Sequence, residues 1–251
     1  MYFPFLDFEK LSAQLRPYLI FWGLGLIAFS AEYLFPARNV PYRAVFFRDL
    51  VALGVYNLSF LLVLPVSNRI PIPNYVPAIV SSLPLAVKLL LFYIVEDFGL
   101  YWVHRLMHTK PLWRTHKWHH YPSYMYWLAG VRTSIPHIFL FNVTFIVARP
   151  LLTGAPYWIF QLIVFEHMLR NNWMHMNVSW SSRWLEHFVV TPRYHHVHHS
   201  SDTEHYRSNF GSLLTVWDRI FGTYTDPGKV KQDLRFGIGE RVAPHRLVLG
   251  V

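Results

Sequence analysis

Histidines at fixed spacings constrain this chain more than any other feature of its sequence. They form three short boxes, which are His104-x-x-x-His108, His116-x-x-His119-His120 and His195-x-x-His198-His199. On a helix, residues three or four apart lie on one face about one turn apart, so two or three such rings can close on a single ion. Boxes that are far apart in the chain must then meet in the fold.

The number of rings indicates more than one metal ion. Neutral imidazole is the commonest protein ligand for metals, and a four-coordinate ion cannot use the eight rings of the three boxes. We therefore predict a two-metal centre. The alternative, surface histidines in a basic tract, does not account for the ligand spacing.

The composition favours a lipid environment. Of the 251 residues, 53% are hydrophobic, 18% aromatic and only 15% charged, whereas about a quarter are charged in soluble domains. The formal net charge of +9 suits anionic lipid headgroups or an acidic protein partner, and the long apolar runs favour these over nucleic acid. The absence of cysteine excludes disulfides, thiolate-bound haem and iron-sulfur clusters, so nitrogen and oxygen must bind any metal.

Apolar runs predict several membrane spans. We expect the first over 18–35 and the second over about 50–66. A third helix is expected to begin near Pro84, capped by Ser81 or Ser82, and to reach His108. Its length of on the order of 37 Å exceeds a hydrocarbon core of roughly 30 Å, so the first box projects beyond the membrane. The first ten residues lack the features of a secretory signal and are expected at the interface, and a proline-rich loop follows the second span.

The segment over about 138–165 decides the topology. It contains two apolar runs separated by a stretch with two prolines and a glycine. One crossing would place the third box across the membrane from the first two, so we predict a hairpin of two short or tilted helices. Arg38, Arg43 and Arg48 lie between the first two spans, and the positive-inside rule places that loop and the boxes in the cytoplasm, with the amino terminus outside.

Further candidates follow the hairpin. His167, Asn171 and His175 are spaced by four on one helix face. His175 is the better ligand candidate because it is further from the bilayer, whereas for His167 a polar contact within the bundle is as open as ligation. Asn171 or Asn177 is a candidate for holding a metal-bound water or orienting a ring.

Asp97 shares a helix face with Tyr101, His104 and His108. It is a candidate acceptor for the N–H of a ligand ring, an arrangement that fixes the metal-binding tautomer. The alternative is an interfacial carboxylate that faces headgroups.

The predicted fold class is all-α, a polytopic membrane helical bundle with a cytosolic, histidine-rich metal-binding cap. Residues 1–251 are expected to form one membrane-embedded domain. Transmembrane helices occupy 18–108, the remaining boxes, the hairpin and an amphipathic cap occupy 109–225, and a polar tail occupies 226–251. The cap helix is predicted from the amphipathic spacing of Phe210, Leu213, Leu214 and Trp217.

The motifs form an ordered pattern over roughly residues 90–225. It runs Asp97-x-x-x-Tyr101-Trp102-x-His104-Arg105-x-x-His108, His116-x-x-His119-His120, His175-x-Asn177, Thr191-Pro192-x-x-His195-x-x-His198-His199-Ser200, Asn209-x-Gly211 and Trp217-Asp218-Arg219-x-Phe221-Gly222-Thr223. Although His-x-x-x-His alone is a weak signal, the joint pattern is specific. It resembles the fatty acid hydroxylase and sterol desaturase superfamily.

The resemblance implies a membrane-embedded helical enzyme that uses a histidine-ligated di-iron site and O2 to hydroxylate or desaturate lipid C–H bonds. It implies ligand roles for His104, His108, His116, His119, His120, His175, His195, His198 and His199. His196 is an additional histidine in the third box, and its role stays open. Members with a fused cytochrome b5 domain are not matched.

The chemistry of the boxes bears on the metal and on a rival function. Zinc binds the same nitrogens tightly, so we expect it as a substitute for iron in a purified sample. The rival is a non-catalytic membrane protein that binds or transports divalent metal, whose ligands would lie along a path near the bilayer midplane. Boxes at one end of the spans favour the oxygenase.

Turnover requires electrons from outside this chain. We find no cysteine for a cluster, no glycine-rich dinucleotide fingerprint and no haem domain. A basic set of residues would attract an acidic ferredoxin or cytochrome b5 in a salt-dependent manner: Lys110, Arg114, Lys117, Arg193 and Arg207. The alternative is that these charges only enforce the positive-inside rule. The sequence does not distinguish a fatty acyl chain, a sterol, an ether lipid or a carotenoid as substrate.

Overall fold

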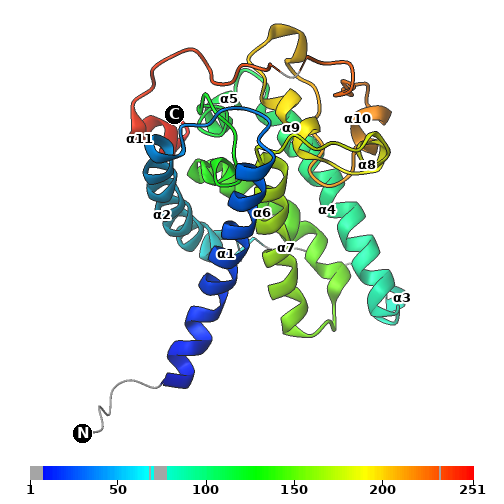
Figure 1. The fold of residues 1–251 in the computed structure, drawn as a ribbon. Coiled ribbons are helices and arrows are strands. Elements are labelled where there is room, and N and C mark those ends of the chain that lie inside the picture. The colour runs from blue at the N-terminus through cyan, green and yellow to red at the C-terminus, as the bar shows by residue number, and fades with distance from the viewer. Residues whose placement is uncertain (1–7, 68, 71–77, 232) are drawn as a thin grey trace, which may run out of the picture.

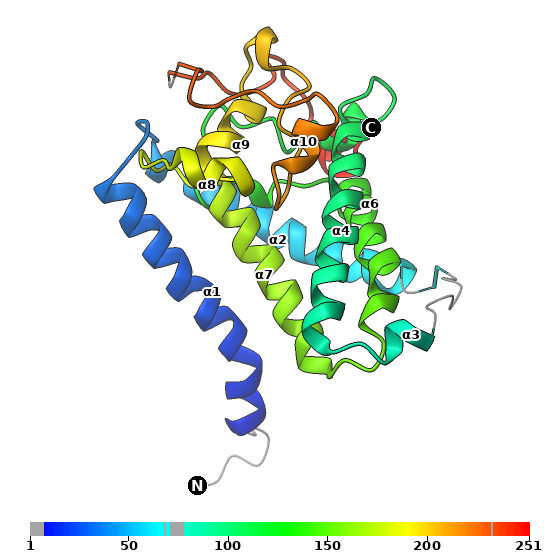
Figure 2. The same cartoon turned by 90° about the vertical axis from the view of Figure 1, so that its right-hand side faces the viewer.

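The computed structural model describes residues 8–67, 69–70, 78–231 and 233–251, and within them the fold is helical, with β pairing limited to isolated bridges. The helical class that the sequence predicts is confirmed. The long helices are α1 (Phe8–Leu34), α2 (Tyr42–Ser67), α4 (Leu85–Met107), α6 (Ile135–Ala148) and α7 (Tyr157–His175). They extend away from the end of the molecule that lies at the top of Figures 1 and 2, opposite the amino terminus.

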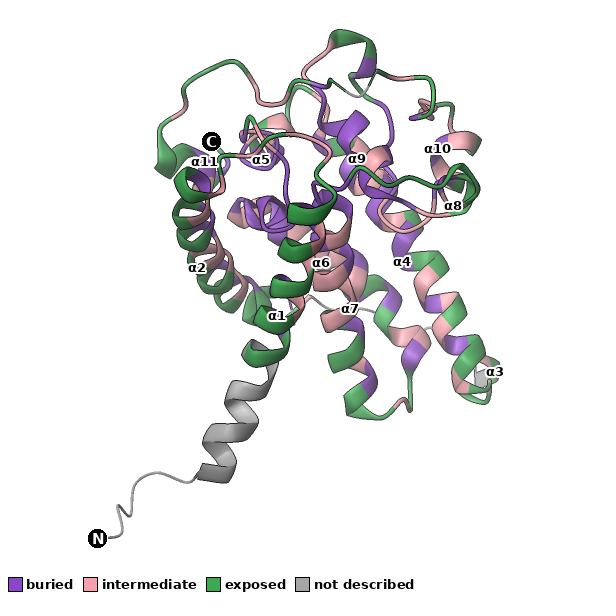
Figure 3. Ribbon diagram, viewed as in Figure 1, coloured by how far each residue is buried: buried purple, intermediate pink, exposed green. Residues whose placement is uncertain are grey.

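Short helices gather at that end, which we call the cap. They are α5 (Trp113–His116), α8 (Arg183–Phe188), α9 (Pro192–His199), α10 (Val216–Ile220) and α11 (Pro244–Leu249). The remaining elements are α3 (Ala78–Ser81), η1 (Ala129–Val131), η2 (Arg149–Leu152) and η3 (Thr203–His205). Figure 3 shows buried residues concentrated around α9, whereas α1 and α2 carry many exposed ones.

Among the described residues, two helical stretches are long and apolar enough to cross a membrane, as judged by length and composition: Tyr42–Ser67 and Ile135–Leu152. The part of α1 over Leu19–Leu34 is a shorter apolar stretch. Large apolar side chains on α1 and α2 are exposed, such as Leu26 at 67% and Leu61 at 66%. Exposed apolar surface of this extent is typical of a surface that contacts lipid or another protein.

Helix α4 carries the first box. It begins at Leu85 with Pro84 at its N-cap, and no side-chain cap forms, so the expected serine cap is wrong. In place of a serine cap, Lys88 holds this end of the helix. Its buried ammonium donates to Ser81 O and Thr153 O, each at 2.8 Å. This contact fastens the start of α4 to the turn that follows η2.

Helices α6 and α7 form a hairpin whose two open ends lie at the cap. The side chain of Ser134 accepts from His137 N at 3.2 Å and Pro136 follows, which is a common way to start a helix. The chain turns through η2, where Gly154 has a φ of 79°. The hairpin brings His175 at the end of α7 back to the level of the boxes.

Two buried carboxylates fasten the first two helices to the core. Glu32 on α1 accepts from Trp127 N at 2.6 Å and Asn177 N at 2.8 Å. Asp49 on α2 accepts from Tyr126 Oη at 2.8 Å and pairs with Arg132. These bonds fix the segment that leads from the second box into the hairpin.

One sequence prediction for the cap is wrong. The expected amphipathic helix from Phe210 is reduced to α10, because N–H groups that would donate four residues back in such a helix donate elsewhere: Leu214 N to Asp97 Oδ2 and Thr215 N to Phe188 O. The tail expected to be polar carries the short helix α11, in which Leu247 is buried. The expectations for the amino terminus and the proline-rich loop fall largely outside the described residues.

Candidate metal centre

The nine histidines proposed as ligands gather in two adjoining groups. The five-histidine group is His104, His108, His116, His120 and His198, and the four-histidine group is His119, His175, His195 and His199. Within each group the ligand atoms lie within 4.8 Å of one another, and all of these side chains are buried except the half-buried His108. No carboxylate of the described residues enters either group.

Each His-x-x-His-His box contributes to both groups. In the second box, His116 and His120 belong to the five-histidine group and His119 belongs to the four-histidine group. In the third box, His195 and His199 belong to the four-histidine group and His198 belongs to the five-histidine group. At about 100° per residue, position i+4 lies about 40° to one side of position i and i+3 about 60° to the other. Two rings of each box therefore face one group, and in the two His-x-x-His-His boxes the third ring faces the other group.

The separations of the ring nitrogens fit a metal ion. Donor atoms about 2.0–2.1 Å from a shared ion stand roughly 2.9–3.4 Å apart for octahedral to tetrahedral angles. In the four-histidine group the Nε2–Nε2 distances are 3.2, 3.3, 3.2 and 3.0 Å. In the other group they are 3.0 Å for His104 with His116 and 3.1 Å for His120 with His198.

Backbone carbonyls determine which nitrogen of several rings faces the centre. The Nδ1–H of His104 donates to Phe210 O at 2.9 Å, that of His198 to Ser208 O at 2.8 Å and that of His175 to Asn171 O at 2.6 Å. A neutral ring that donates from Nδ1 presents the lone pair of Nε2, which is the tautomer a metal needs.

Burial keeps the rings neutral. It lowers the pKa of His119, His195 and His199 well below the ordinary value of 6.5. Below pH 6.5 these rings take up protons in the unfolded chain but not in the metal-free fold. Proton uptake then favours the unfolded chain, so the stability of the metal-free fold is full above that pH and falls as the pH drops. At neutral pH the rings can therefore bind metal without first losing a proton.

The carboxylate of Asp218 holds the loop that carries two of these carbonyls. Fully buried, it accepts from Phe210 N at 2.8 Å, Gly211 N at 2.7 Å, Tyr194 Oη at 2.5 Å and Thr223 Oγ1 at 2.6 Å. The loop of residues 208–211 is thereby fixed against α9. The sequence pattern contains Asp218 but gives no reason for it.

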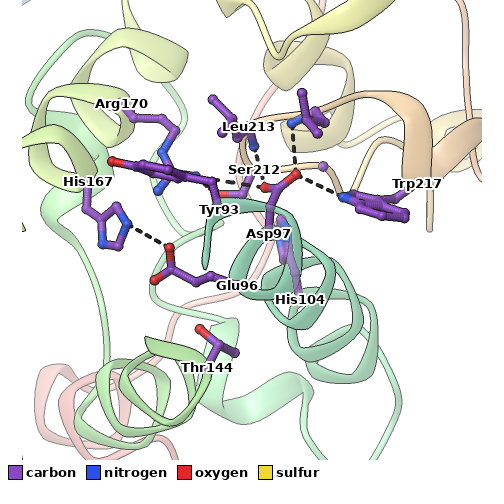
Figure 4. Close-up of polar contacts among 12 residues, drawn as sticks. Tyr93, Glu96, Asp97, His104, Thr144, His167, Arg170, Ser212, Leu213 and Trp217 are labelled. Atoms are coloured by element: carbon purple, nitrogen blue, oxygen red, sulfur yellow. Dashed lines mark hydrogen bonds and ion pairs between the residues drawn. The ribbon is translucent and has the colours of Figure 1, made fainter. Parts of the chain in front are cut away.

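Asp97 does not contact a ligand ring. Its oxygens accept from Leu213 N at 2.8 Å, Leu214 N at 3.0 Å and Trp217 Nε1 at 2.9 Å, and Arg170 lies 3.9 Å away (Figure 4). Both predicted environments are therefore corrected, because the buried carboxylate accepts from no histidine ring and is not at the surface. It fastens α4, the helix of the first box, to the segment before α10.

Asn177 and His196 lie beside the centre and outside both groups. Asn177 accepts from Arg38 N at 3.0 Å and donates to Arg38 O at 2.7 Å, so it orients a loop and no ligand ring. Arg38 donates to Nδ1 of His196 at 2.9 Å, and His196 Nε2 lies 3.5 Å from His175 O. His196 therefore replaces none of its neighbours.

His167 also lies outside the two groups. Its Nε2 is 3.0 Å from Glu96 Oε2 (Figure 4), and Glu96 is buried at 2% exposure. The polar contact within the bundle is thus what the structure shows, and this pair links α4 to α7.

His137 is a residue that sequence reasoning missed. It is 3% exposed on α6, and its Nδ1 lies 3.2 Å from Nδ1 of His116. If Nε2 of His116 binds metal, its Nδ1–H donates to His137. No spacing signal reveals this residue, because it stands alone in an apolar run and only the hairpin brings it to the second box.

We expect His137→Leu to lower metal affinity at the five-histidine group about 10- to 100-fold, since the ring of His116 loses its acceptor. His137→Gln keeps an acceptor and should restore most of that affinity. Metal-to-protein ratios under chelator competition measure the effect. Equal metal retention in wild type and both variants would contradict the role.

Fold and site together define a class: a helical protein with two adjoining candidate metal sites made only of imidazoles. Comparison with known protein families then identifies the family. Residues 89–223 match the model of the fatty acid hydroxylase family, so the chain belongs to that family and the resemblance is confirmed. No solved structure matches the chain significantly.

The chain is similar to several lipid-modifying proteins. It is 32% identical over 151 residues to ornithine lipid hydroxylase OlsE of Rhizobium tropici and 31% identical over 145 residues to alkylglycerol monooxygenase of Danio rerio. It is 24% identical over 155 residues to a Delta(7)-sterol 5(6)-desaturase of Gibberella zeae. Each match covers 57% of this chain and 44%, 32% and 43% of the respective relative. The chain thus spans less than half the length of these relatives.

Proposed function

We propose that this protein is a membrane oxidoreductase that uses O2 and external electrons to hydroxylate or desaturate a C–H bond of a lipid. The observation that carries the proposal is the pair of histidine groups, nine buried or half-buried rings without a carboxylate, in a member of the fatty acid hydroxylase family. The names of three relatives, a lipid hydroxylase, a monooxygenase and a sterol desaturase, support the reaction class.

Iron is the metal we propose for both groups, one ion in each. Two ferrous ions bound there would supply the reducing equivalents that activate O2. The protein's part is to hold the rings: the carbonyls of Phe210, Ser208 and Asn171 orient His104, His198 and His175. Burial of the groups excludes water from the reacting atoms. Zinc fits the same nitrogens and is expected as a non-working substitute.

We further propose that α2 and the hairpin lie in the membrane with the cap in the cytoplasm. The apolar stretches Tyr42–Ser67 and Ile135–Leu152 support the insertion. The arginines between α1 and α2 support a cytoplasmic location of the cap, because basic loops favour the cytoplasmic side of a membrane. A cap at the membrane surface places both histidine groups where a lipid carbon and a soluble electron donor can reach them.

Mass spectrometry of lipid extracts tests the function. Cells that express the chain should contain a lipid with one more oxygen or two fewer hydrogens, and cells that express His119→Ala should not. Purified membranes given lipid and reductant should consume O2 only when iron is present. Metal flux into liposomes without O2 consumption would support the rival, a metal transporter.

The electron donor is proposed to be an acidic ferredoxin or cytochrome b5. Of the basic set predicted to attract it, Lys117 pairs with Glu240 at 2.5 Å and Arg193 with Glu186 at 2.5 Å. Paired cations contribute little to steering. The remaining three, Lys110, Arg114 and Arg207, make no ion pair in the part of the chain that the structure describes.

We expect donor-limited activity to fall as ionic strength rises from low to near-physiological, because screening weakens attraction between exposed charges. Arg114→Gln should raise the donor concentration needed for half-maximal rate, and Lys117→Gln should change it less. Stopped-flow reduction at several salt concentrations measures both. Salt-independent rates would count against docking through this surface.

A further inference from the structure

A cavity borders the five-histidine group at the C-terminal end of α4. It has a volume of about 210 Å³ and is lined by Arg105, His108, Thr109, Arg207, Phe210 and Thr223. His108 is the member of the group that is half-buried, and its Nε2 has no hydrogen-bond partner among the described residues. The cavity therefore reaches the ring of His108 at the edge of the cap, whereas the Nε2 atom of that ring stays buried, and it has room for several waters.

Two arginines give the cavity a positive charge that nothing in the described chain neutralises. Arg105 donates to Tyr101 Oη at 3.0 Å and lies 5.3 Å from the ring centroid of Trp102, but it has no carboxylate partner. Arg207 is exposed and likewise makes no ion pair with any described residue. The nearby Asp218 is buried and its oxygens are occupied by four donors. Guanidinium groups without a counter-charge at a recess are a typical setting for phosphate or carboxylate.

The cavity lies where an apolar surface meets the cap. On the adjoining faces of α4 and α10 several large apolar side chains are exposed: Phe98 at 40%, Leu106 at 48% and Ile220 at 61%. Trp102 packs against Phe221 with ring centroids 4.9 Å apart, and Figure 2 shows α10 beside α4 below the loops of the cap. Aromatic side chains at the end of an apolar helix mark the level of lipid headgroups.

We propose that this cavity binds the phosphate of a membrane phospholipid between Arg105 and Arg207. A phosphate held there places the glycerol and the first chain carbons of that lipid beside His108. The proposal rests on the proposed function for the claim that this lipid is the one oxidised, and the binding itself can be measured without turnover. A recess that opens onto exposed apolar residues suits a lipid better than the surface of a docking protein, so Arg207 is assigned here to the lipid and Lys110 and Arg114 remain for the donor.

The test is native mass spectrometry of the full, metal-loaded chain in detergent. It is titrated with dioleoyl phosphatidic acid and, for comparison, with dioleoylglycerol, which has the same chains without the phosphate. Wild type should bind phosphatidic acid on the order of tenfold more tightly. Arg105→Gln and Arg207→Gln should each remove most of that difference, and Arg207→Lys should retain part of it. Lys110→Gln, an exposed cation that does not line the cavity, is the matched control and should bind as wild type does.

Three outcomes would overturn the proposal. The first is unchanged phosphatidic acid binding in both arginine-to-glutamine variants. The second is displacement of the lipid by millimolar inorganic phosphate, which would make the site one for a soluble anion. The third is normal lipid binding in these variants with loss of salt-dependent reduction by the donor, which would make the arginines a protein-docking surface.

Iron content and O2 consumption in the same samples separate this proposal from the proposed function. Unchanged iron in Arg207→Gln together with weaker lipid binding supports the site, because fold and metal centre are then intact. Arginine-dependent lipid binding in a protein that consumes no O2 would support the site while it counts against the oxidoreductase.

Discussion

Replacing one histidine of either group by alanine is expected to lower the metal content at that group. His119→Ala leaves three rings in the four-histidine group, whereas His198→Ala leaves four in the five-histidine group. We therefore expect the larger loss, more than about 100-fold weaker binding, in His119→Ala, since metal binding is coupled to folding of the site. Iron-to-protein ratios under chelator competition should fall in both variants, and further in His119→Ala.

The control for this prediction is His245→Ala. His245 is exposed on α11 and belongs to neither group, so iron content should match wild type. Equal iron in all three variants would show that the two groups are not the metal centre. A double variant, His119→Ala with His198→Ala, should bind almost none.

Asp218→Ala is expected to destabilise the cap severely. The substitution leaves three donors buried without an acceptor, namely Phe210 N, Gly211 N and Tyr194 Oη, whereas Thr223 Oγ1 keeps Tyr101 Oη at 2.9 Å. At about 1–3 kcal/mol for each buried unsatisfied group, the loss is about 3 kcal/mol or more. That is a large part of the roughly 5–15 kcal/mol that stabilises a typical domain.

Iron binding should fall with stability in Asp218→Ala, because the loop that Asp218 holds supplies the carbonyls for His104 and His198. Thermal unfolding in detergent and iron content measure the two effects. Asp226→Ala is the matched control, since Asp226 is half-buried and accepts from Gly228 N in its own turn. An Asp218→Ala protein that melts within about 2 °C of the control would contradict the role.

The sequence by itself determined the identity of the candidate ligands and the class of fold. Ligand spacing is local, because residues three and four apart on one helix must lie close together whatever the rest of the chain does. The three boxes and His175 therefore stand out without a structure. The extent of α4 is local too, since an apolar run without a breaker after Pro84 favours one helix.

Only the tertiary structure decided how the ligands are divided and what supports them. The spacing separates the middle ring of each His-x-x-His-His box from the other two, but which group each ring joins depends on how α9 faces the second box, and no spacing encodes that. His137 reaches His116 only because the hairpin folds back, and Asp97 meets the backbone of Leu213 and Leu214 rather than a ring. Buried donors take whichever acceptor the packing brings within reach, so these partners, unlike the spacing of the boxes, are properties of the fold as a whole.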